Sequence, residues 1–312
     1  MTAFYLILFL AACCLTIWRL EAMSKYGMDG TVLGTLITPY CTGMPNLIFV
    51  LVMAKQGGSG AEVLTNCVVN NVTNLTLLIG LPAALWGMAI TPGKKPGSSS
   101  PQLNRLSMLL TLFAVLFFTG IAWAMGRRKE IGFTDGLFLI GLFLCWQLFH
   151  IFDLIKTNRR RHKTLGRILY LDLFLLVAAS YAIYLSTDGL VAWLSIIPSG
   201  FISARHLGWL SGWLDVLPNG VLAFYYGWKR RAEVVYTSQV GDGHICIPLC
   251  IGLFALFKPI AVQPFFETGV LILCAATLVH LLFIGASGRL PRLAGWILTA
   301  AYGLFLYLGL LH

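Results

Sequence analysis

The stretch Thr35-Leu-Ile-Thr-Pro-Tyr-Cys-Thr-Gly-Met-Pro-Asn46 lies in a segment apolar enough to cross a membrane, yet it holds two prolines, a glycine and several hydroxyl and amide groups. A second polar stretch, Asn66-Cys-Val-Val-Asn-Asn-Val-Thr-Asn74, begins twenty residues after Asn46. In hydrocarbon every backbone polar group must be satisfied, so proline-interrupted helices rich in amides are tolerated only where they line an enclosed cavity. The two stretches therefore predict a polar site at membrane depth, built on broken helices.

A similar pair of polar positions occurs in the second half of the chain. Leu217-Pro218-Asn219 repeats Met44-Pro45-Asn46, and Gln239 follows Asn219 as Asn66 follows Asn46. The offset is 173 residues for both pairs, from 46 to 219 and from 66 to 239. Matching proline-interrupted segments in two halves are typical of the binding site of a transporter. A chance recurrence of a short tripeptide is the alternative.

The composition indicates a membrane protein. Hydrophobic residues make up 58% of the chain and charged residues 11%, whereas soluble domains carry about 25% charged residues. The mean hydropathy is +0.82. The net charge of +10 comes mainly from short basic clusters between apolar runs, a pattern typical of membrane topology and not of nucleic-acid binding. We therefore expect the lipid bilayer, and no nucleic acid, as a partner.

No catalytic serine, cysteine or zinc constellation is evident in the sequence, so we expect no enzyme activity and no cofactor. The eight cysteines lie mostly in apolar segments and lack the paired spacing of metal ligands. Cys246-x3-Cys250 comes nearest, but small residues that pack between helices explain this pair better than a metal site does.

Ten segments reach the length of about twenty residues that a helix needs to span a bilayer. They lie near 2–22, 30–55, 61–89, 104–126, 131–155, 168–197, 207–228, 234–257, 268–286 and 293–311. The expected fold is all-α, a polytopic membrane protein of about ten transmembrane helices. The predicted domains are a first five-helix half at 1–155 with a repeat at 30–89, a basic linker at 156–167, and a second five-helix half at 168–312 with a repeat at 203–262. Because each half has an odd number of spans, the two halves enter the membrane oppositely, as inverted-topology repeats with broken helices at the midplane.

The distribution of basic residues predicts the orientation. The linker from Lys156 to Arg167 carries six Lys or Arg residues, so we expect it to be cytoplasmic. Five spans precede the linker, which puts the N-terminus outside. Arg127-Arg128-Lys129 is an exception on the outer side. We expect an integral protein of a bacterial inner (cell) membrane, and the pattern carries no prediction of the oligomeric state.

The polar motifs resemble those of the calcium/cation antiporter superfamily, most closely its sodium/calcium exchanger branch. Each of two inverted repeats in that family carries a G-T-S-L-P-E-like motif and then a G-N-x-I-G-S-x-x-x-N-like motif. Cys41-Thr-Gly-Met-Pro-Asn46 stands at the first motif and Thr65 to Asn74 at the second, while Thr187-Asp188-Gly189 is similar to the family's D-G pair before the second repeat. The resemblance implies a cation antiporter whose partners are small inorganic cations.

The chain departs from the family at the main cation ligands. The resemblance implies a glutamate at the end of each first motif, and both positions hold amides here, Asn46 and Asn219. Calcium takes roughly six to eight oxygen ligands and prefers carboxylates among them. Asp215, one helical turn before Asn219 and aligned with Thr42 of the first repeat, is a candidate to restore one charge. The alternative for Asp215 is a place near the membrane surface or at a helix end, paired with Lys or Arg.

The function we expect is secondary active transport by a cation antiporter whose ion selectivity is altered because both glutamates are asparagine. The alternative is a non-transporting accessory or sensing membrane protein of the same fold. With fewer fixed charges, we expect weak or absent sodium/calcium exchange, and coupling through a monovalent cation or protons carried by Asp215 or His244. The sequence does not specify which metal ion binds. The predicted ion-binding residues are Thr42, Asn46, Asn66, Asn70, Asn74, Asp215, Asn219, Gln239, Asp242 and His244.

Overall fold

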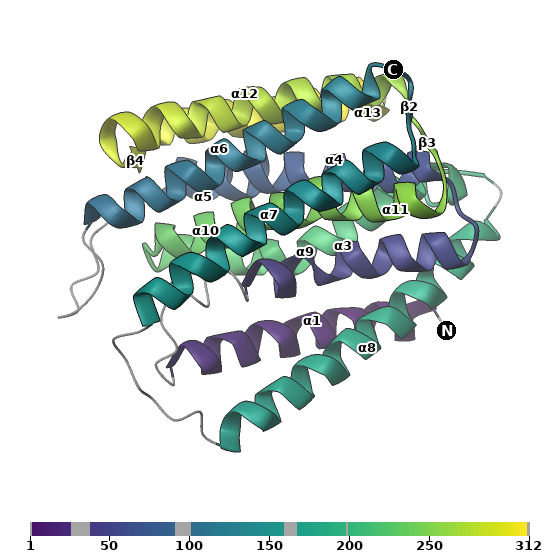
Figure 1. Ribbon diagram of the computed structural model, residues 1–312, viewed down its shortest axis with the longest axis horizontal. Helices are drawn as coiled ribbons and strands as arrows, with labels where there is room; N and C mark the ends of the chain where they lie inside the picture. Colours follow the sequence, from purple (N-terminus) through teal and green to yellow (C-terminus); the bar gives the residue numbers. More distant parts are fainter. Residues whose placement is uncertain (1, 26–37, 91–100, 159–166, 198, 311–312) are drawn as a thin grey trace.

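A computed structural model describes residues 2–25, 38–90, 101–158, 167–197 and 199–310, and these residues form a bundle of long helices (Figure 1). The α-helices are α1 (Thr2–Lys25), α3 (Thr38–Lys55), α4 (Gly60–Val72), α5 (Ile79–Trp86), α6 (Pro101–Gly126), α7 (Phe133–Asn158), α8 (Arg167–Ser195), α9 (Leu207–Trp228), α10 (Ala232–His244), α11 (Gly252–Phe257), α12 (Pro264–Ser287) and α13 (Arg292–Leu310). The π-helical turns η2 (Thr73–Leu78) and η4 (Ile245–Ile251) join α4 to α5 and α10 to α11, and η3 (Ala204–His206) is a 3₁₀ turn. The short strands are β1 (Met88–Ala89), β2 (Glu130–Ile131), β3 (Ile260–Ala261) and β4 (Arg289–Leu290).

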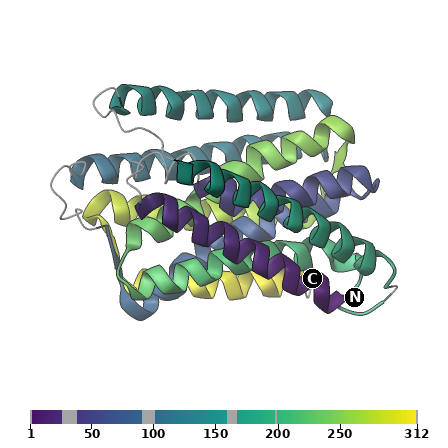
Figure 2. The same ribbon diagram turned by 90° about the horizontal axis from the view of Figure 1, so that it is seen from below.

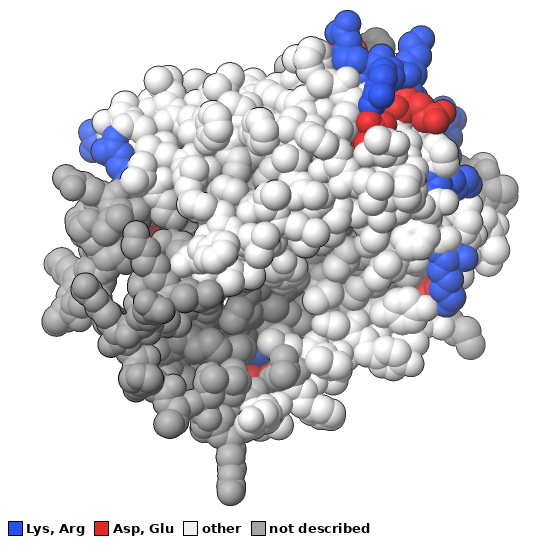
Figure 3. Space-filling model, viewed as in Figure 1, with Lys and Arg blue, Asp and Glu red and all other residues white. Residues whose placement is uncertain are grey.

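The surface of the bundle suits a lipid bilayer. Among the described residues, eight helical stretches are long and apolar enough to cross a membrane, and a shorter apolar helix covers Gly43–Lys55. On the face shown in Figure 3, charged side chains gather toward the two ends of the molecule, and the surface between them is mostly uncharged. Hydrocarbon tolerates an uncharged band of this kind and excludes exposed charges. The protein is therefore an integral membrane protein.

The prolines of the repeated motif do not break their helices. Helix α3 continues through Pro45 and helix α9 through Pro218, so the prediction of helix breaks at these positions is wrong. Proline removes one backbone hydrogen bond, and such a loss is tolerated where neighbouring helices satisfy the freed group. The irregular geometry lies one helix further on, in η2 and η4, whose wider turns are often found at functional sites.

Pairs of helices pack around a polar centre. Helix α1 packs mainly along α8, α4 along α9, α5 along α13, and α6 along α12. In Figure 1 the pair α1 and α8 lies along one edge of the bundle and α6 and α12 lie along the opposite edge, with α3, α4, α9 and α10 between them. Figure 2 views the molecule from the side of α1 and α8. This arrangement buries most of the stretches from α4 to α5 and from α10 to α11, whereas α9 keeps an exposed face that includes Leu217 and Val221.

The two central helical stretches, α4 to α5 and α10 to α11, run in opposite directions. A Cβ atom added to Gly60, at the start of the first stretch, would lie 3.0 Å from the Cα atom of Ile260, which follows the second stretch. At the other end, the guanidinium of Arg230, just before α10, donates a hydrogen bond to the carbonyl oxygen of Trp86 at the end of α5. The start of each stretch therefore lies beside the end of the other.

The four strands repeat this relation at the two ends of the bundle. Strand β1, which follows α5, pairs antiparallel with β4, which follows α12. Strand β3, which follows α11, pairs antiparallel with β2, which follows α6. Each central stretch is thus tied at its end to a helix from the other half of the chain.

A buried ion pair joins α1 to α8. The Arg19 Nη1 atom lies 3.1 Å from the Asp172 Oδ1 atom, and only 1% of the aspartate side chain is exposed. A buried charge without a partner costs several kcal/mol, so each of these groups needs the other. Asp172 therefore serves the contact between two helices.

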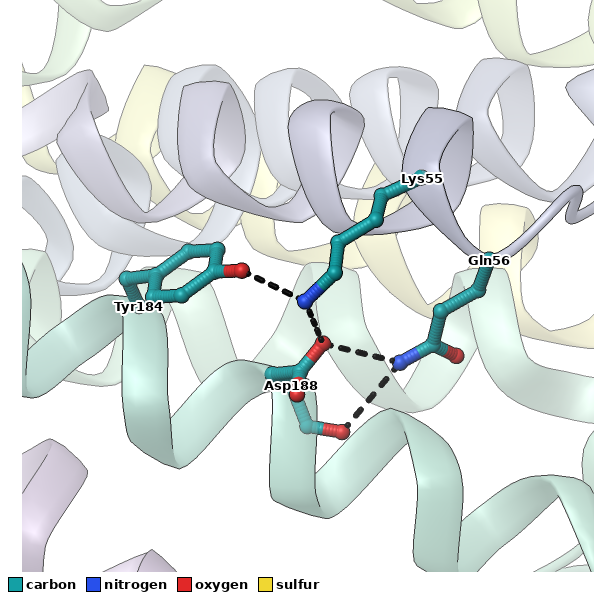
Figure 4. A network of polar contacts seen from close by, with 4 residues as sticks. All are labelled: Lys55, Gln56, Tyr184 and Asp188. Atoms are coloured by element: carbon teal, nitrogen blue, oxygen red, sulfur yellow. Dashed lines mark hydrogen bonds and ion pairs between the residues drawn. The ribbon is translucent and has the colours of Figure 1, made fainter.

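A second polar contact joins α3 to α8 near the molecular surface (Figure 4). The Lys55 Nζ atom donates to the Tyr184 hydroxyl at 2.7 Å and lies 3.6 Å from the Asp188 Oδ1 atom. The Gln56 Nε2 atom donates to the same Asp188 oxygen at 3.1 Å. Asp188, singled out by its likeness to the family's D-G pair, is thus engaged at the end of α3.

Candidate functional site

One buried carboxylate lies at the centre of the polar residues. The Asp242 Oδ2 atom, on α10, accepts a hydrogen bond from Asn74 Nδ2 of η2 at 2.7 Å and another from Asn219 Nδ2 of α9 at 3.1 Å. All three side chains are fully buried. Because a carboxylate is costly to bury, two amide donors on one of its oxygens are a substantial compensation. Asp242 therefore joins the helices of both halves at a single point.

The hydrogen-bond network extends from Asp242 to the other repeated asparagine. Asn74 Nδ2 also donates to Asn70 Oδ1 at 2.8 Å, and Asn70 Nδ2 donates to Asn46 Oδ1 at 2.9 Å. On the opposite side, Gln239 Nε2 donates to the backbone oxygen of Asn219 at 3.2 Å. The structure thus brings six of the predicted residues into one set of contacts, which we call the amide network: Asn46, Asn70, Asn74, Asn219, Gln239 and Asp242.

Asn66 and Asp215 form a separate pair. Asn66 Nδ2 donates to Asp215 Oδ2 at 2.9 Å and to Ser211 Oγ at 2.9 Å. Asp215 is 2% exposed, so it does not fit the alternative of a surface carboxylate paired with a basic side chain. The structure therefore places a second buried carboxylate beside the amide network, on the contact between α4 and α9.

Two glycines explain how α4 and α9 approach closely enough for this pair. A Cβ atom on Gly212 would lie 3.0 Å from the Asn66 carbonyl oxygen, and one on Gly208 would lie 2.5 Å from the Glu62 carbonyl oxygen. Glycines four residues apart are a common device for close helix packing in membranes. The sequence interpretation missed this Gly-x3-Gly signal and, with it, Ser211, which lies between the two glycines.

Besides Asn66 and Asp215, two further predicted residues are not seen in the network. His244 is buried, but its Nε2–H donates to the Thr111 carbonyl oxygen of α6 at 3.0 Å, and its ring lies 5.1 Å from that of Trp146 of α7. His244 therefore faces the outer helices. Thr42 belongs to α3, and its side chain lies outside the described part of the chain.

The register between the two repeats differs from the one read from the sequence. Helices α3 and α9 end at 55 and 228, an offset of 173, whereas α4 and α10 begin at 60 and 232, an offset of 172. The connection before α10 is one residue shorter, and η2 and η4 begin at 73 and 245 with the same offset of 172. The counterpart of Asn70 is therefore Asp242 and not Gly243, and the counterpart of Asn66 is Ser238 and not Gln239.

Part of the sequence is similar to that of known ion exchangers. A family model described as "Sodium/calcium exchanger protein" matches residues 1–152. The sodium/calcium exchanger MaX1 of Methanosarcina acetivorans is 28% identical over 105 residues, which is 34% of this chain and 28% of that protein. The sodium/potassium/calcium exchanger 3 of Rattus norvegicus is 26% identical over 141 residues, which is 42% of this chain and 21% of that protein. The matches thus span less than a third of the length of these relatives.

The fold extends the similarity to nearly the whole chain. The solved structure of the sodium-calcium exchanger NCX_Mj, soaked with 2.5 mM Na+ and 10 mM Sr2+, aligns with a TM-score of 0.70 over 97% of this chain and 98% of that one, at 15% identity. Residues 1–152 are therefore similar to sodium/calcium exchangers, and nearly the whole chain has the fold of NCX_Mj. Proteins of the exchanger family are transporters, so the prediction that the chain is not an enzyme is confirmed.

The exchanger-like chain presents several buried oxygen atoms without hydrogen-bond partners. On α4, η2, α9 and α10 these atoms are Asn66 Oδ1, Asn71 Oδ1, Asn74 Oδ1, Asn219 Oδ1 and Gln239 Oε1, and others lie on α6, α7 and α8. Buried acceptors in native proteins are almost always satisfied, and a dehydrated cation satisfies several oxygen atoms at once. Among the described residues, no group of three or more His, Cys, Asp or Glu side chains is placed to hold a metal ion. The chemistry therefore suits a cation held mainly by amide oxygens and one carboxylate.

Proposed function

We propose that this exchanger-like chain is a secondary active transporter, a cation antiporter whose ions bind in the amide network around Asp242. One observation carries the proposal. A single buried carboxylate receives amides from both halves of the chain, Asn74 and Asn219, and both of these side chains keep an unpartnered oxygen. Movement of one half against the other would change the coordination of a bound ion, which is what alternating access requires.

The selectivity follows from the charge of this site. Asn46 and Asn219 stand where the family resemblance implies glutamates, so two formal charges are missing. A unit charge at 4 Å contributes about 4 kcal/mol per ion charge at an effective dielectric near 20. A dehydrated divalent ion therefore loses about twice as much as a monovalent ion. The remaining charges are those of Asp242 and of Asp215, so calcium binding should be weak, with coupling through a monovalent cation or protons.

The architecture we propose for transport is ten spans in two inverted-topology repeats, at 30–89 and 203–262. The opposite directions of the α4–α5 and α10–α11 stretches support it, as does the matching strand pairing at the two ends. Both prolines and both asparagines of the repeated motif lie in corresponding helices, α3 and α9. We further propose that the basic linker at 156–167 is cytoplasmic, that the N-terminus is outside, and that the protein resides in a bacterial inner membrane.

Ion flux in proteoliposomes tests the proposed function. Vesicles loaded with sodium, potassium, calcium or protons are diluted into media that lack the loaded ion, and counter-ion uptake is followed with radioactive tracers or ion-sensitive dyes. We expect gradient-driven movement of a monovalent cation or protons, with sodium-dependent calcium uptake weak. Vesicles without protein set the background.

Two results would contradict this account. Strong sodium-dependent calcium uptake that survives Asp215→Asn would show that missing charges do not limit the site. Absence of flux for all four ions would favour the accessory or sensing protein, for which the loss of both glutamates is the motivating observation.

A further inference from the structure

Three buried thiols lie on α4 and η4, close along the chain to residues of the amide network. Cys67 on α4 and both Cys246 and Cys250 on η4 are fully buried. Packing between helices accounts for small buried residues at these positions. It does not account for the direction in which the Cys246 thiol points.

The Cys246 sulfur points at the ion-binding groups. Its Sγ atom lies 3.9 Å from Asp242 Oδ1 and 3.8 Å from Asn70 Oδ1. The two amides that hold Asp242 bind its other oxygen, Oδ2, so the thiol occupies the free side of the carboxylate. On the same side, a Cβ atom on Gly43 would lie 2.9 Å from Asp242 Oδ1, so the glycine is needed to leave that oxygen uncovered.

The offset between the two repeats shows which residue of the first half corresponds to Cys246. With the offset of 172 residues that relates α4 to α10, Cys246 is the counterpart of Asn74. Asn74 contributes an unpartnered amide oxygen to the network. In the second half of the chain, a sulfur atom therefore stands where the first half supplies an oxygen atom.

We propose that Cys246 is a ligand of the cation site, and that the site takes thiophilic divalent cations, of the class of Cd2+ and Zn2+, through Cys246 Sγ, Asp242 and the Asn70 amide oxygen. This inference rests on the proposed function, because it concerns the same site. Binding breaks the S–H bond of Cys246, forms a sulfur–metal bond and releases the proton to solvent, without any change in oxidation state. The thiolate and the Asp242 carboxylate then balance the two charges of the ion.

The sulfur ligand discriminates between divalent ions. Calcium is a hard cation that takes oxygen ligands, so it gains little from a thiol and retains the charge deficit left by Asn46 and Asn219. Thiolates bind zinc and other soft or borderline ions well. The site should therefore prefer Cd2+ to Ca2+, and the missing glutamates matter less for ions that can displace the thiol proton.

The test uses the full-length protein purified in detergent, in a background where the exposed Cys14 and Cys145 are replaced by serine. CdCl2 is titrated while the ultraviolet absorbance of sulfur-to-cadmium charge transfer and the heat of binding are recorded. We expect saturable binding with a charge-transfer band. Cys246→Ser should remove the band and weaken Cd2+ binding by at least about tenfold. Cys274→Ser, a matched change of a half-buried thiol on α12, should leave both signals unchanged.

The outcomes separate this inference from the proposed function. If Cys246→Ser binds Cd2+ with the parent affinity and band, the thiols are packing residues and the inference is wrong, whatever the flux assay shows. If the band and its dependence on Cys246 are present while no ion flux is found, the thiol site stands and the transport proposal fails. A thermal unfolding midpoint and a size-exclusion elution volume equal to those of the parent protein would show that Cys246→Ser is folded.

Discussion

Replacing Asp242 with asparagine is expected to lower the affinity for any transported cation by about a hundredfold or more, and to abolish measurable flux. Asp242 is the carboxylate to which Asn74 and Asn219 both donate, and it is fully buried. The loss of a unit charge at about 4 Å removes about 4 kcal/mol from a monovalent ion at an effective dielectric near 20, of which the new amide oxygen returns a part. A hundredfold change corresponds to about 2.7 kcal/mol. Flux and binding in reconstituted vesicles measure the effect.

A matched control is available on α8. Asp188→Asn makes the same chemical change at a half-exposed aspartate that contacts Lys55 at the end of α3. We expect this variant to retain ion binding. If Asp242→Asn transports as the parent protein does, or if both variants lose transport equally, Asp242 is not the centre of the ion site.

Restoring both glutamates should raise the affinity of the site for calcium. In the double variant Asn46→Glu/Asn219→Glu, we expect calcium affinity to rise by about ten- to a hundredfold, because two carboxylates are added to the amide network. Asn219 Nδ2 now donates to Asp242, so a glutamate there repels Asp242 until a cation arrives. The variant should therefore be less stable than the parent without calcium, and calcium should raise its apparent Tm more than it raises that of the parent.

The corresponding amide change serves as the control. Asn46→Gln/Asn219→Gln has the same side-chain length as the glutamate pair and adds no charge, so calcium affinity should stay low. Tracer uptake of calcium and thermal unfolding with and without calcium provide the two measurements. Equal calcium responses in the glutamate and glutamine variants would contradict the assignment of these two positions to the ion site.

Much of the amide network could be predicted from the sequence. Burying amide side chains in an apolar segment is costly, so their presence there indicates a polar site. Asn46 and Asn219 were found from their tripeptides, and both lie in the network. The register was less predictable, since it depends on the length of one short connection before α10. Because this connection is one residue shorter, the pairing read from the sequence did not match Asn70 with Asp242. For the same reason it did not match Asn74 with Cys246.

Other features could not be derived from sequence patterns. The π-helical turns η2 and η4 have no strong local signal, whereas the prolines that suggested broken helices are accommodated within α3 and α9. His244 follows Asp242 of the network by two residues, but its ring faces α6, where the Nε2–H donates to the Thr111 carbonyl oxygen. Polarity predicted which side chains matter, and packing decided which of them meet.

Anomalous diffraction from crystals grown with Cd2+ tests the central claim most directly, because it locates the cation. The account predicts one strong peak within bonding distance of Asp242, with Asn70 and Cys246 among the other ligands, and its loss in Asp242→Asn. A peak bound by other residues, or none in the amide network while the protein binds Cd2+ in solution, would contradict the claim that this network is the cation site.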